Sequence, residues 1–589
     1  MLQETVLGQV ARLAQQPFGV QLAVSNSTTV LGESEELGPV RVLEFEAGVD
    51  GPLLITLQVP LADAVGFWHP DSRHHRTVLP DWMGREVTSL VNSAPIGCLY
   101  DNSGRNLLTF GLGELVQEVE MRFGVSEEEK TFVVHLTLLR ASAGRRVKLA
   151  LAAPGTDYTE AIGSIGEWFR EQVGVPSMPV PEFATEPVYS TWYSFSQDVD
   201  ASSLEDEAAI AVAIGLKALF IDDGWQRYGH GRGYAGCGDW APDEAKFPDF
   251  RAHVERLREL GLKVVVWVAP LLLGSKSDRY GELASLAPAY KEELDTHIID
   301  PRLPEAREHL VEVCLRLVRD YGIDGLKIDF LNEAMIYKTA PSTGDISDVG
   351  LAMQAWMGDL VQALAEIGRP DVLLEFRQPY VSPSIAPYGN VLRANDCPAD
   401  AISNRTSIVD ARLLASGRVI HSDMMMWDPT GSDHVASRQL LNAFFGVPQI
   451  SVRLTTLPAE HRRVLEFGLA QWESVKSVVL GGDLTGGLPV ENYPWLSARS
   501  DDGVRVVGVY QPAVVRIESA DTDVLVLNAT AQDHLVLEFA RPTANGAGAI
   551  DVEVFKPDGT LVMAETGVPV SEFYRLPVPR CGTARLRRR

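Results

Sequence analysis

VYSTWYSF (residues 188–195), ALFIDDGW (218–225) and KVVVWVAP (263–270) begin a series of eight short apolar runs in the middle of this chain. The series continues with GLKIDF (325–330), VLLEFR (372–377), VLRAND (391–396), VIHSDMM (419–425) and VPQISV (447–452). Amphipathic stretches, with apolar residues every three to four positions, lie between several of the runs, for example at 303–322 and 349–368. Strands that alternate with helices form parallel sheets, and about eight such units predict a closed (β/α)8 barrel.

The segments on either side of this series have a different pattern. Alternating apolar and polar residues, as in VRVLEFEAG (40–48) and KTFVVHLTLL (130–139), fill much of 18–150 and return after 481, as in GVRVVGVYQ (503–511). A period of two is typical of antiparallel strands with one buried face. We therefore predict a multidomain α/β protein with an N-terminal antiparallel β domain (1–180), a catalytic barrel (187–480) and a C-terminal antiparallel β-sandwich (481–589).

Charge and composition exclude several kinds of partner. Among 589 residues, 52 Lys and Arg stand against 79 Asp and Glu, which gives a net charge of −27. A negative net charge of this size repels nucleic acids and anionic membranes. No apolar stretch approaches the roughly 20 residues of a membrane span. The first residues lack the pattern of a secretory signal, so we expect a soluble, cytoplasmic protein.

Metal and redox chemistry are not expected. The 5 cysteines are scattered without a paired spacing, which predicts reduced thiols. His69, His74 and His75 share one segment, but no second cluster at ligand spacing accompanies them, so we interpret the segment as an exposed loop. We therefore predict neither a metal nor another cofactor.

Polar residues at the ends of barrel strands are the first candidates for an active site, because the loops after the strands build the sites of such barrels. Alternate side chains of a strand point the same way, so Lys327 and Asp329 are predicted to face one mouth of the barrel as a pair. A neighbouring ammonium favours the ionised carboxylate that a nucleophile needs, which suits Asp329. The alternatives are a purely structural salt bridge here and, for Asp222 and Asp223, a turn or helix cap.

Taken together, these motifs resemble the α-galactosidases of glycoside hydrolase family 36 and, more distantly, family 27. DDGW (222–225) resembles the family's sugar-binding element, KID (327–329) its nucleophile motif, and RANDCPADAISNR (393–405) its acid/base segment. The resemblance implies a central (β/α)8 TIM barrel between an N-terminal β supersandwich and a C-terminal β domain. It implies Asp329 as nucleophile, Asp396 as acid/base with Asp400 as the alternative, and these sugar-binding residues: Asp222, Asp223, Lys327 and Arg393.

Aromatic side chains complete the predicted site, because the apolar faces of a sugar ring stack on Trp. Trp192 and Trp267 end the first and third runs, and packing in the core is the alternative for both. Trp68 lies in the N-terminal domain, and the resemblance implies that an aromatic residue from that domain can reach the barrel mouth. His421 and Asp423, which end the seventh run, are expected to support the site or to contact the sugar.

One segment departs from the family pattern. The chain has LEFRQPYVSPS (374–384) in place of a Cys- and Gly-rich stretch, which brings Arg377 and Gln378 to the fifth strand end, and Arg377 is predicted to contact substrate. The leading interpretation is a retaining exo-α-galactosidase that acts on small α-glycosides or oligosaccharides. Alternatives are a related α-glycosidase for a glucoside, a xyloside, an N-acetylgalactosaminide or another modified sugar, a transglycosylase, a non-catalytic carbohydrate-binding protein, and a metal- or phosphate-using barrel enzyme. The aglycone and the oligomeric state stay open.

Overall fold

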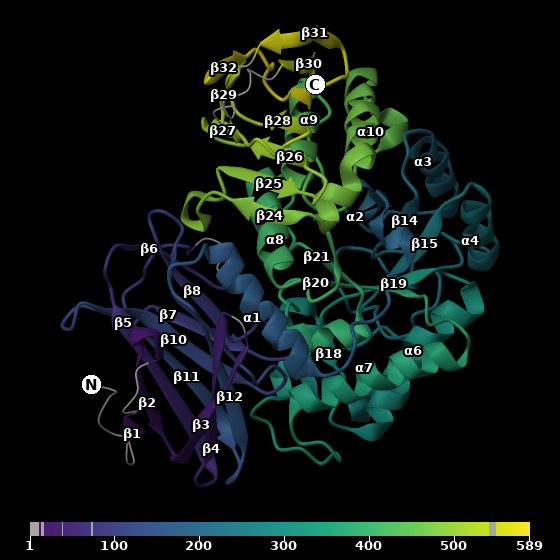
Figure 1. The fold of residues 1–589 in the computed structure, drawn as a ribbon. Helices are drawn as coiled ribbons and strands as arrows, with labels where there is room; N and C mark the ends of the chain where they lie inside the picture. The colour runs from purple at the N-terminus through teal and green to yellow at the C-terminus, as the bar shows by residue number, and fades with distance from the viewer. Residues whose placement is uncertain (1–10, 13–16, 38, 72–74, 541–548, 570) are drawn as a thin grey trace.

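The centre of the molecule is one sheet of eight parallel strands (Figure 1). The computed structural model describes residues 11–12, 17–37, 39–71, 75–540, 549–569 and 571–589. The strands stand in the order β22-β21-β20-β19-β15-β14-β13-β23, and parallel bridges from His421 to Val447 and from Met425 to Ile450 join the two edges. The sheet thus closes into the predicted barrel. Its strands are β13 (Val188–Ser190), β14 (Ala218–Ile221), β15 (Lys263–Val268), β19 (Gly325–Ile328), β20 (Leu373–Arg377), β21 (Val391–Arg393), β22 (Val419–His421) and β23 (Gln449–Ile450).

Amphipathic helices surround these strands, because the apolar face of each helix packs on the apolar outer side of the sheet. Aspartate N-caps stabilise several helix starts. The side chains that accept hydrogen bonds from backbone N–H groups of the first turn are those of Asp200, Asp249, Asp348 and Asp400. The principal helices are α3 (Ala201–Ala213), α4 (Phe250–Glu259), α6 (Pro304–Tyr321), α7 (Val349–Glu366), α8 (Ala401–Leu413), α9 (Asp433–Ala443) and α10 (Ala459–Gly481). The loop after β13 carries α2 (Trp192–Phe195), and the loop after β19 carries the 3-10 helix η5 (Leu331–Tyr337). The long segment after β15 carries α5 (Tyr280–Leu283) and a small sheet of β16 (Leu272–Leu273), β17 (Ala289–Lys291) and β18 (Thr296–Ile298).

The N-terminal domain consists of two six-stranded antiparallel sheets. Their facing sides share one apolar core, which includes Phe45, Leu57, Phe110 and Phe132. One sheet contains β1 (Ala11–Arg12), β2 (Gln21–Ser25), β5 (Gly51–Pro60), β7 (Gly84–Thr88), β10 (Val119–Ser126) and β11 (Thr131–Ala141); the other contains β3 (Ser27–Leu37), β4 (Val40–Ala47), β6 (Ala64–Trp68), β8 (Ile96–Asp101), β9 (Asn106–Leu112) and β12 (Arg146–Ala152). Helix α1 (Tyr158–Val173) lies between this domain and the barrel (Figure 1).

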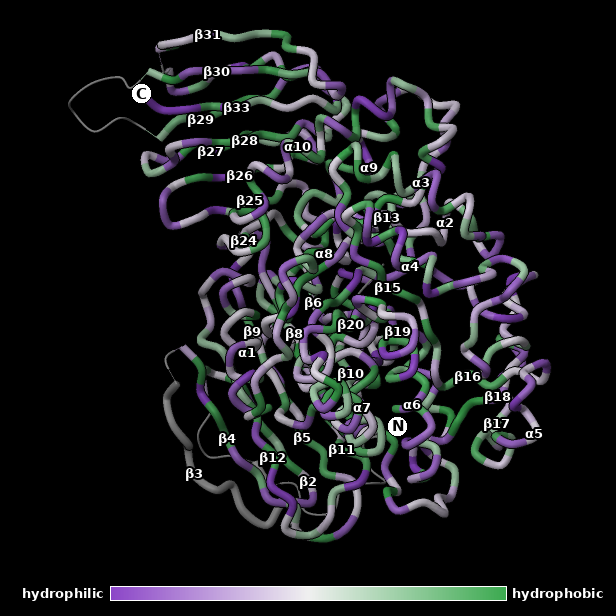
Figure 2. The backbone as a smooth tube through the Cα atoms, turned by 90° about the vertical axis from the view of Figure 1, so that its right-hand side faces the viewer, coloured by the Kyte–Doolittle hydropathy of each residue, from purple (hydrophilic) through white to green (hydrophobic). Residues whose placement is uncertain are grey.

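The C-terminal domain contains a seven-stranded and a three-stranded sheet. Most neighbouring strands are antiparallel, as predicted, but the pairs β26/β28 and β27/β29 are parallel. The strands are β24 (Asp483–Gly486), β25 (Trp495–Arg499), β26 (Val504–Val509), β27 (Val514–Ile517), β28 (Asp523–Asn528), β29 (Leu535–Phe539), β30 (Ala549–Phe555), β31 (Leu561–Pro569), β32 (Phe573–Leu576) and β33 (Thr583–Arg588). Figure 2 shows hydrophobic stretches within the barrel region and along the strands of the terminal domains. The predicted fold class is therefore confirmed.

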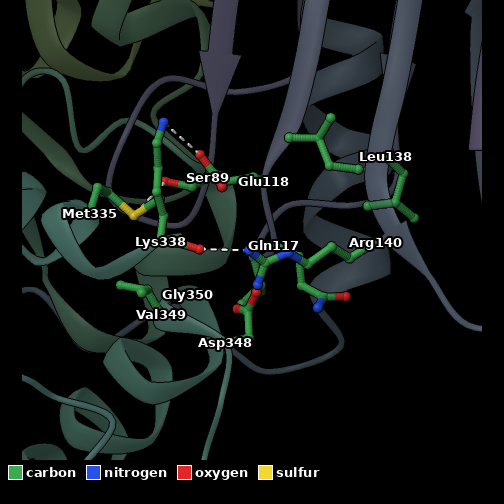
Figure 3. Close-up of a pocket in the computed structure, with 12 residues that line it drawn as sticks. Ser89, Gln117, Glu118, Leu138, Arg140, Met335, Lys338, Asp348, Val349 and Gly350 are labelled. Atoms are coloured by element: carbon green, nitrogen blue, oxygen red, sulfur yellow. Dashed lines mark hydrogen bonds and ion pairs between the residues drawn. The ribbon is translucent and has the colours of Figure 1, made fainter. Parts of the chain in front are cut away.

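Side chains from two domains meet in a pocket beside the barrel (Figure 3). Lys338, just after η5, lies 3.2 Å from Glu118 of the N-terminal domain, and Arg140 Nη2 donates to the Lys338 carbonyl at 2.7 Å. These contacts hold the segment that follows the fourth barrel strand against the N-terminal domain.

Among the described residues, no helix has the length and apolar character needed to cross a membrane. The five cysteines are all free, and burial raises the pKa of the Cys237 and Cys314 thiols above their ordinary range.

Candidate active site

The second barrel strand delivers two carboxylates to the mouth of the barrel. Strand β14 ends at Ile221, and Asp222 and Asp223 follow it directly, both almost fully buried. Gly224 then has a φ of +116°, and a Cβ there would lie 2.5 Å from the Gln197 Cα, so only glycine fits this turn. The two carboxylates neither cap a helix nor close a turn with their side chains, and they are held by polar side chains.

Lys327 contacts the first of these carboxylates. Its Nζ donates to Asp222 Oδ2 at 2.5 Å, and both side chains are buried. Lys327 thus makes its direct contact with Asp222 rather than with Asp329, and its charge helps to lower the pKa of Asp329, as expected of the pair. Strands β14 and β19, which lie on either side of β15, bring Asp222 and Lys327 together, and the sequence pattern within one strand does not show this.

Asp223 is held by two amides. Gln226 Nε2 donates to one of its oxygens at 2.6 Å and Gln197 Nε2 to the other at 2.7 Å. Burial raises the pKa of Asp223 to about 6; the two amides oppose this shift, and the charges of Asp222 and Asp329 add to it. Neither glutamine belongs to a motif that the sequence analysis singled out.

Asp329 lies at the end of β19, where three elements converge. Its Oδ1 accepts hydrogen bonds from Arg377 Nε at 2.6 Å and from the Phe330 N–H at 2.7 Å, and its Oδ2 accepts from Trp267 Nε1 at 3.2 Å. Its side chain is 13% exposed. Burial acts to raise the pKa of Asp329, but the Arg377 guanidinium, helped by Lys327, holds it below its ordinary value. Asp329 is thus an ionised carboxylate with a small solvent-facing surface.

The acid/base candidate lies on the segment after β21. Arg393 Nη2 donates to Asp396 Oδ1 at 2.7 Å, and the Asp396 side chain is 52% exposed. Desolvation by its neighbours acts to raise the pKa of Asp396, but the guanidiniums of Arg393 and Arg377 hold it well below its ordinary value. Asp400, the alternative, accepts from the N–H groups of Ile402 and Ser403 and caps α8. Its side chain therefore serves the helix start.

A third carboxylate shares the Arg393 guanidinium. Asp423 is fully buried; it pairs with Arg393 and accepts from Tyr193 OH at 3.1 Å and from the Cys397 N–H at 2.8 Å. Burial raises the pKa of Asp423 to about 6, against the opposing charge of Arg393. These contacts give Asp423 the supporting position that was one of its two predicted roles.

His421 lies deeper than Asp423, in the barrel interior. It contacts Glu375 at 3.0 Å, and its Nε2 donates to the Ala184 carbonyl at 2.8 Å. Both His421 and Glu375 are buried, so this cluster supports the strand ends from below.

The aromatic candidates separate into two groups. Trp267 is at the site, with its indole on Asp329, and Trp192 is half-buried with the Arg232 guanidinium 5.7 Å above its ring. Trp192 begins helix α2, because the first barrel strand already ends at Ser190. Trp68 does not reach the mouth: it is fully buried, and its Nε1 donates to Asp410 on α8 at 2.9 Å. The predicted role of Trp68 in sugar binding is therefore wrong.

The histidine segment also differs from expectation at one position. His69 is buried between the rings of Phe67 and Phe123, and burial lowers its pKa to about 4. His75 is exposed, as predicted for the loop, and His74 lies outside the described residues. The aromatic side chains around His69 belong to the apolar core of the N-terminal domain.

Comparison with known proteins gives one family match and several relatives. The melibiase family matches residues 182–363, which contain the first four barrel strands. α-Galactosidase C of Emericella nidulans is 28% identical over 181 residues, 28% of this chain and 24% of that protein. Probable α-galactosidase G of Aspergillus terreus is 26% identical over 383 residues, 58% of this chain and 50% of that protein. The matches thus span about a quarter to a half of the relatives' length.

Solved structures share the fold over nearly the whole chain. The family 36 α-galactosidase AgaA of Geobacillus stearothermophilus has a TM-score of 0.64 at 15% identity, covering 98% of this chain and 83% of the other. TtGalA, an α-galactosidase of Thermus thermophilus, has a TM-score of 0.55 at 19% identity, covering 79% of this chain and 95% of the other. Residues 182–363 thus match the melibiase family, and the chain shares the fold of solved glycoside hydrolase family 36 α-galactosidases, which agrees with the resemblance of its motifs.

Proposed function

We propose that this protein is a retaining, exo-acting α-galactosidase that releases terminal α-D-galactosyl residues in two displacements. The observation that carries the proposal is the ionised, solvent-reached carboxylate of Asp329 at the barrel mouth; only strand β20 separates its strand, β19, from β21, which leads to Asp396. Retaining glycosidases place two carboxyl groups about 5 Å apart on either side of the scissile bond.

In the first displacement, Asp329 attacks the anomeric carbon while Asp396 protonates the departing glycosidic oxygen. Arg393 favours the ionised form of Asp396 in the free enzyme. A bound substrate covers the exposed Asp396 side chain; this desolvation raises its pKa, so that Asp396 takes up a proton from solvent on binding and can donate it to the leaving group. Because Arg393 also pairs with Asp423, the carboxyl groups of Asp396 and Asp423 share one guanidinium. When Asp396 is protonated, the Arg393 charge still stabilises the Asp423 carboxylate.

In the second displacement, Asp396 takes a proton from water, which attacks the anomeric carbon and releases Asp329. Arg393 supports this step directly, since it stabilises the carboxylate form that acts as the base. The net result is hydrolysis with the α configuration kept, and each carboxyl returns to its starting protonation state.

Galactose is the proposed sugar because Asp222, Asp223 and Lys327 place acceptors and a donor together beside the nucleophile. An axial O4 distinguishes galactose from glucose, and a buried carboxylate left without its hydroxyl costs roughly 1–3 kcal/mol. Among the solved relatives, AgaA variants were crystallised with raffinose and stachyose, and TtGalA with p-nitrophenyl α-D-galactopyranoside. These ligands support an oligosaccharide or aryl galactoside as substrate here.

A panel of p-nitrophenyl α-glycosides tests the proposal: galactoside, glucoside, xyloside and N-acetylgalactosaminide, each with and without a chelator. We expect the highest kcat/KM with the galactoside and no effect of the chelator. Preference for another glycoside would overturn the choice of sugar, and inactivity on all four would overturn the glycosidase proposal. Asp329→Ala, a folded variant, should lose activity by about 10³-fold or more.

A further inference from the structure

Strand β20 stands between the two strands that lead to the catalytic carboxylates. The sheet order is β19-β20-β21; Lys327 of β19 pairs with Glu375 of β20, and Arg377 of β20 pairs with Arg393 of β21. A residue at the end of β20 can therefore touch both neighbouring segments. The two residues at this point are Arg377 and Gln378, where the sequence departs from the family pattern.

Arg377 is fixed against the nucleophile. Its Nε donates to Asp329 Oδ1 at 2.6 Å, and its Nη1 donates to the Gln378 carbonyl at 2.9 Å. Its guanidinium also lies 5.7 Å from the centre of the Phe330 ring and 5.4 Å from that of Tyr380. Because the planar guanidinium donates both to the Asp329 carboxylate and to the Gln378 carbonyl, it holds Asp329 in one orientation relative to β20.

Gln378 is fixed against the acid/base segment. Its backbone N–H donates to the Arg393 carbonyl at 3.0 Å, and its side-chain Oε1 accepts from the Asn395 N–H at 3.0 Å. Asn395 immediately precedes Asp396, and the Gln378 side chain is buried. A buried amide oxygen that meets a backbone N–H sets the course of the chain at that point, because loss of the acceptor leaves the N–H unsatisfied.

We propose that Arg377 and Gln378 form a bridge that sets the separation of the two catalytic carboxyl groups, with Arg377 holding Asp329 and Gln378 holding the backbone ahead of Asp396. The inference rests on the proposed function. It makes both residues positioning residues, and it assigns Arg377 to the nucleophile, whereas the sequence analysis expected Arg377 to bind substrate. The bridge matters because the distance between the carboxyls decides whether the second one can protonate the leaving group.

The two halves of the bridge act on different parts of the first displacement. Loss of the Gln378 contact displaces Asp396, so proton donation weakens, and only substrates with poor leaving groups need that proton. Loss of the Arg377 contact misplaces Asp329, so attack slows for every leaving group. A merely structural role for Gln378 would lower the activity on both substrates alike. A merely structural role for Arg377 would leave the acidic limb of the pH profile of kcat/KM unchanged, whereas loss of its contact with Asp329 should move that limb to higher pH, because the guanidinium holds the pKa of Asp329 down.

The experiment measures kcat/KM for 2,4-dinitrophenyl α-galactoside and for methyl α-galactoside, since kcat/KM reports the steps up to departure of the leaving group. For Gln378→Met we expect a fall of about 10²-fold with the methyl glycoside and less than about 3-fold with the dinitrophenyl glycoside. For Arg377→Met we expect a fall of about 10²-fold with both, and for Arg377→Lys a smaller fall with both, because the charge stays while the second hydrogen bond is lost.

Matched controls test whether loss of a comparable contact elsewhere has the same effect. Arg307, a buried arginine on α6, likewise donates to one carboxylate (Asp345, 2.7 Å) and one carbonyl (Pro301, 2.9 Å). Gln471 on α10 donates to Thr583 at 2.9 Å. Arg307→Met and Gln471→Met should leave the ratio of the two kcat/KM values within about 2-fold of the wild type, since neither residue contacts the site.

The outcomes separate the inference from the proposed function. Equal losses on both substrates for Gln378→Met, or a leaving-group dependence for Arg377→Met, in an active wild-type enzyme would overturn the bridge and leave the α-galactosidase proposal standing. A wild type without activity on either substrate would overturn the proposed function, and the bridge with it. Circular dichroism of all variants identifies any that do not fold, and Arg377→Lys then replaces Arg377→Met in the comparison.

Discussion

Replacing Asp410 with asparagine should destabilise the protein by about 3–5 kcal/mol, because it removes the buried negative charge that pairs with the Arg76 guanidinium. Asp410 is buried on α8 and accepts hydrogen bonds from Trp68 Nε1 at 2.9 Å, from Arg76 Nη2 at 2.7 Å and from Tyr493 OH at 2.5 Å. The donors come from the N-terminal domain and from the segment that enters the C-terminal domain. One carboxylate therefore joins three parts of the chain.

The size of the effect follows from burial. Arg76 and Asp410 are each 4% exposed, so water cannot replace the lost partner. At roughly 2–4 °C per kcal/mol for a cooperative unit of about 200 residues, the expected fall in melting temperature is about 6–20 °C. Asp371, whose exposed side chain pairs with Arg369 at 3.1 Å, is the control, and Asp371→Asn should cost less than about 1 kcal/mol.

A double-mutant cycle in urea checks the reasoning. Arg76→Met and Asp410→Leu are measured alone and together, and the pair should cost less than the sum of the single changes by about 1.5 kcal/mol or more, since the double variant leaves no buried charge. Additive costs, or an Asp410→Asn variant as stable as Asp371→Asn, would refute the view that this cluster joins the domains through a buried ion pair.

Three further predictions concern the barrel mouth. The pKa of Asp223 is raised to about 6, so its contribution to stability is present below about pH 4 and lost as the pH rises through 6. The free energy of unfolding of Asp223→Asn, measured in urea, should therefore rise by up to about 3 kcal/mol relative to that of the wild type between pH 4 and pH 7. A difference that stays constant with pH would contradict this. Lys246 Nζ donates to three backbone carbonyls, among them that of Gly224 at 2.8 Å. Lys246→Met should therefore raise KM for p-nitrophenyl α-galactoside by a larger factor than it lowers kcat. An unchanged KM would contradict a role of Lys246 in shaping the sugar-binding turn. Asp396→Ala should accumulate the glycosyl-enzyme with a dinitrophenyl substrate and regain turnover with azide, whereas rescue of Asp400→Ala instead would reassign the acid/base.

The barrel was predictable because its strands are largely buried on both faces and read as short, mainly apolar runs between amphipathic segments. The same runs placed Asp222, Asp329 and Asp396 at strand ends, and the structure brings these residues to one mouth. What a run does not contain is the identity of the neighbouring strand. Lys327 on β19 therefore contacts Asp222 on the far side of β15, and Arg377, on the strand next to β19, makes the direct contact with Asp329.

Two other differences have a similar physical origin. In β6, Phe67 faces the core of the N-terminal domain while Trp68 faces α8, because successive side chains of a strand point to opposite sides. The sequence shows the alternation but not which side meets the barrel. Gln378 acts through a single amide oxygen on a backbone N–H, and such a contact has no residue pattern by which it could be recognised.

The central claim is that Asp329 forms a covalent bond to the sugar, and proton NMR of the first-formed product tests it most directly. An α-galactoside is mixed with the enzyme at a concentration high enough for hydrolysis to outpace mutarotation, and the anomeric proton of the released galactose is followed from the first spectrum. Two displacements predict that the α anomer appears first and equilibrates later. Appearance of the β anomer first would contradict the account, because it would require a single displacement by water with no bond to Asp329.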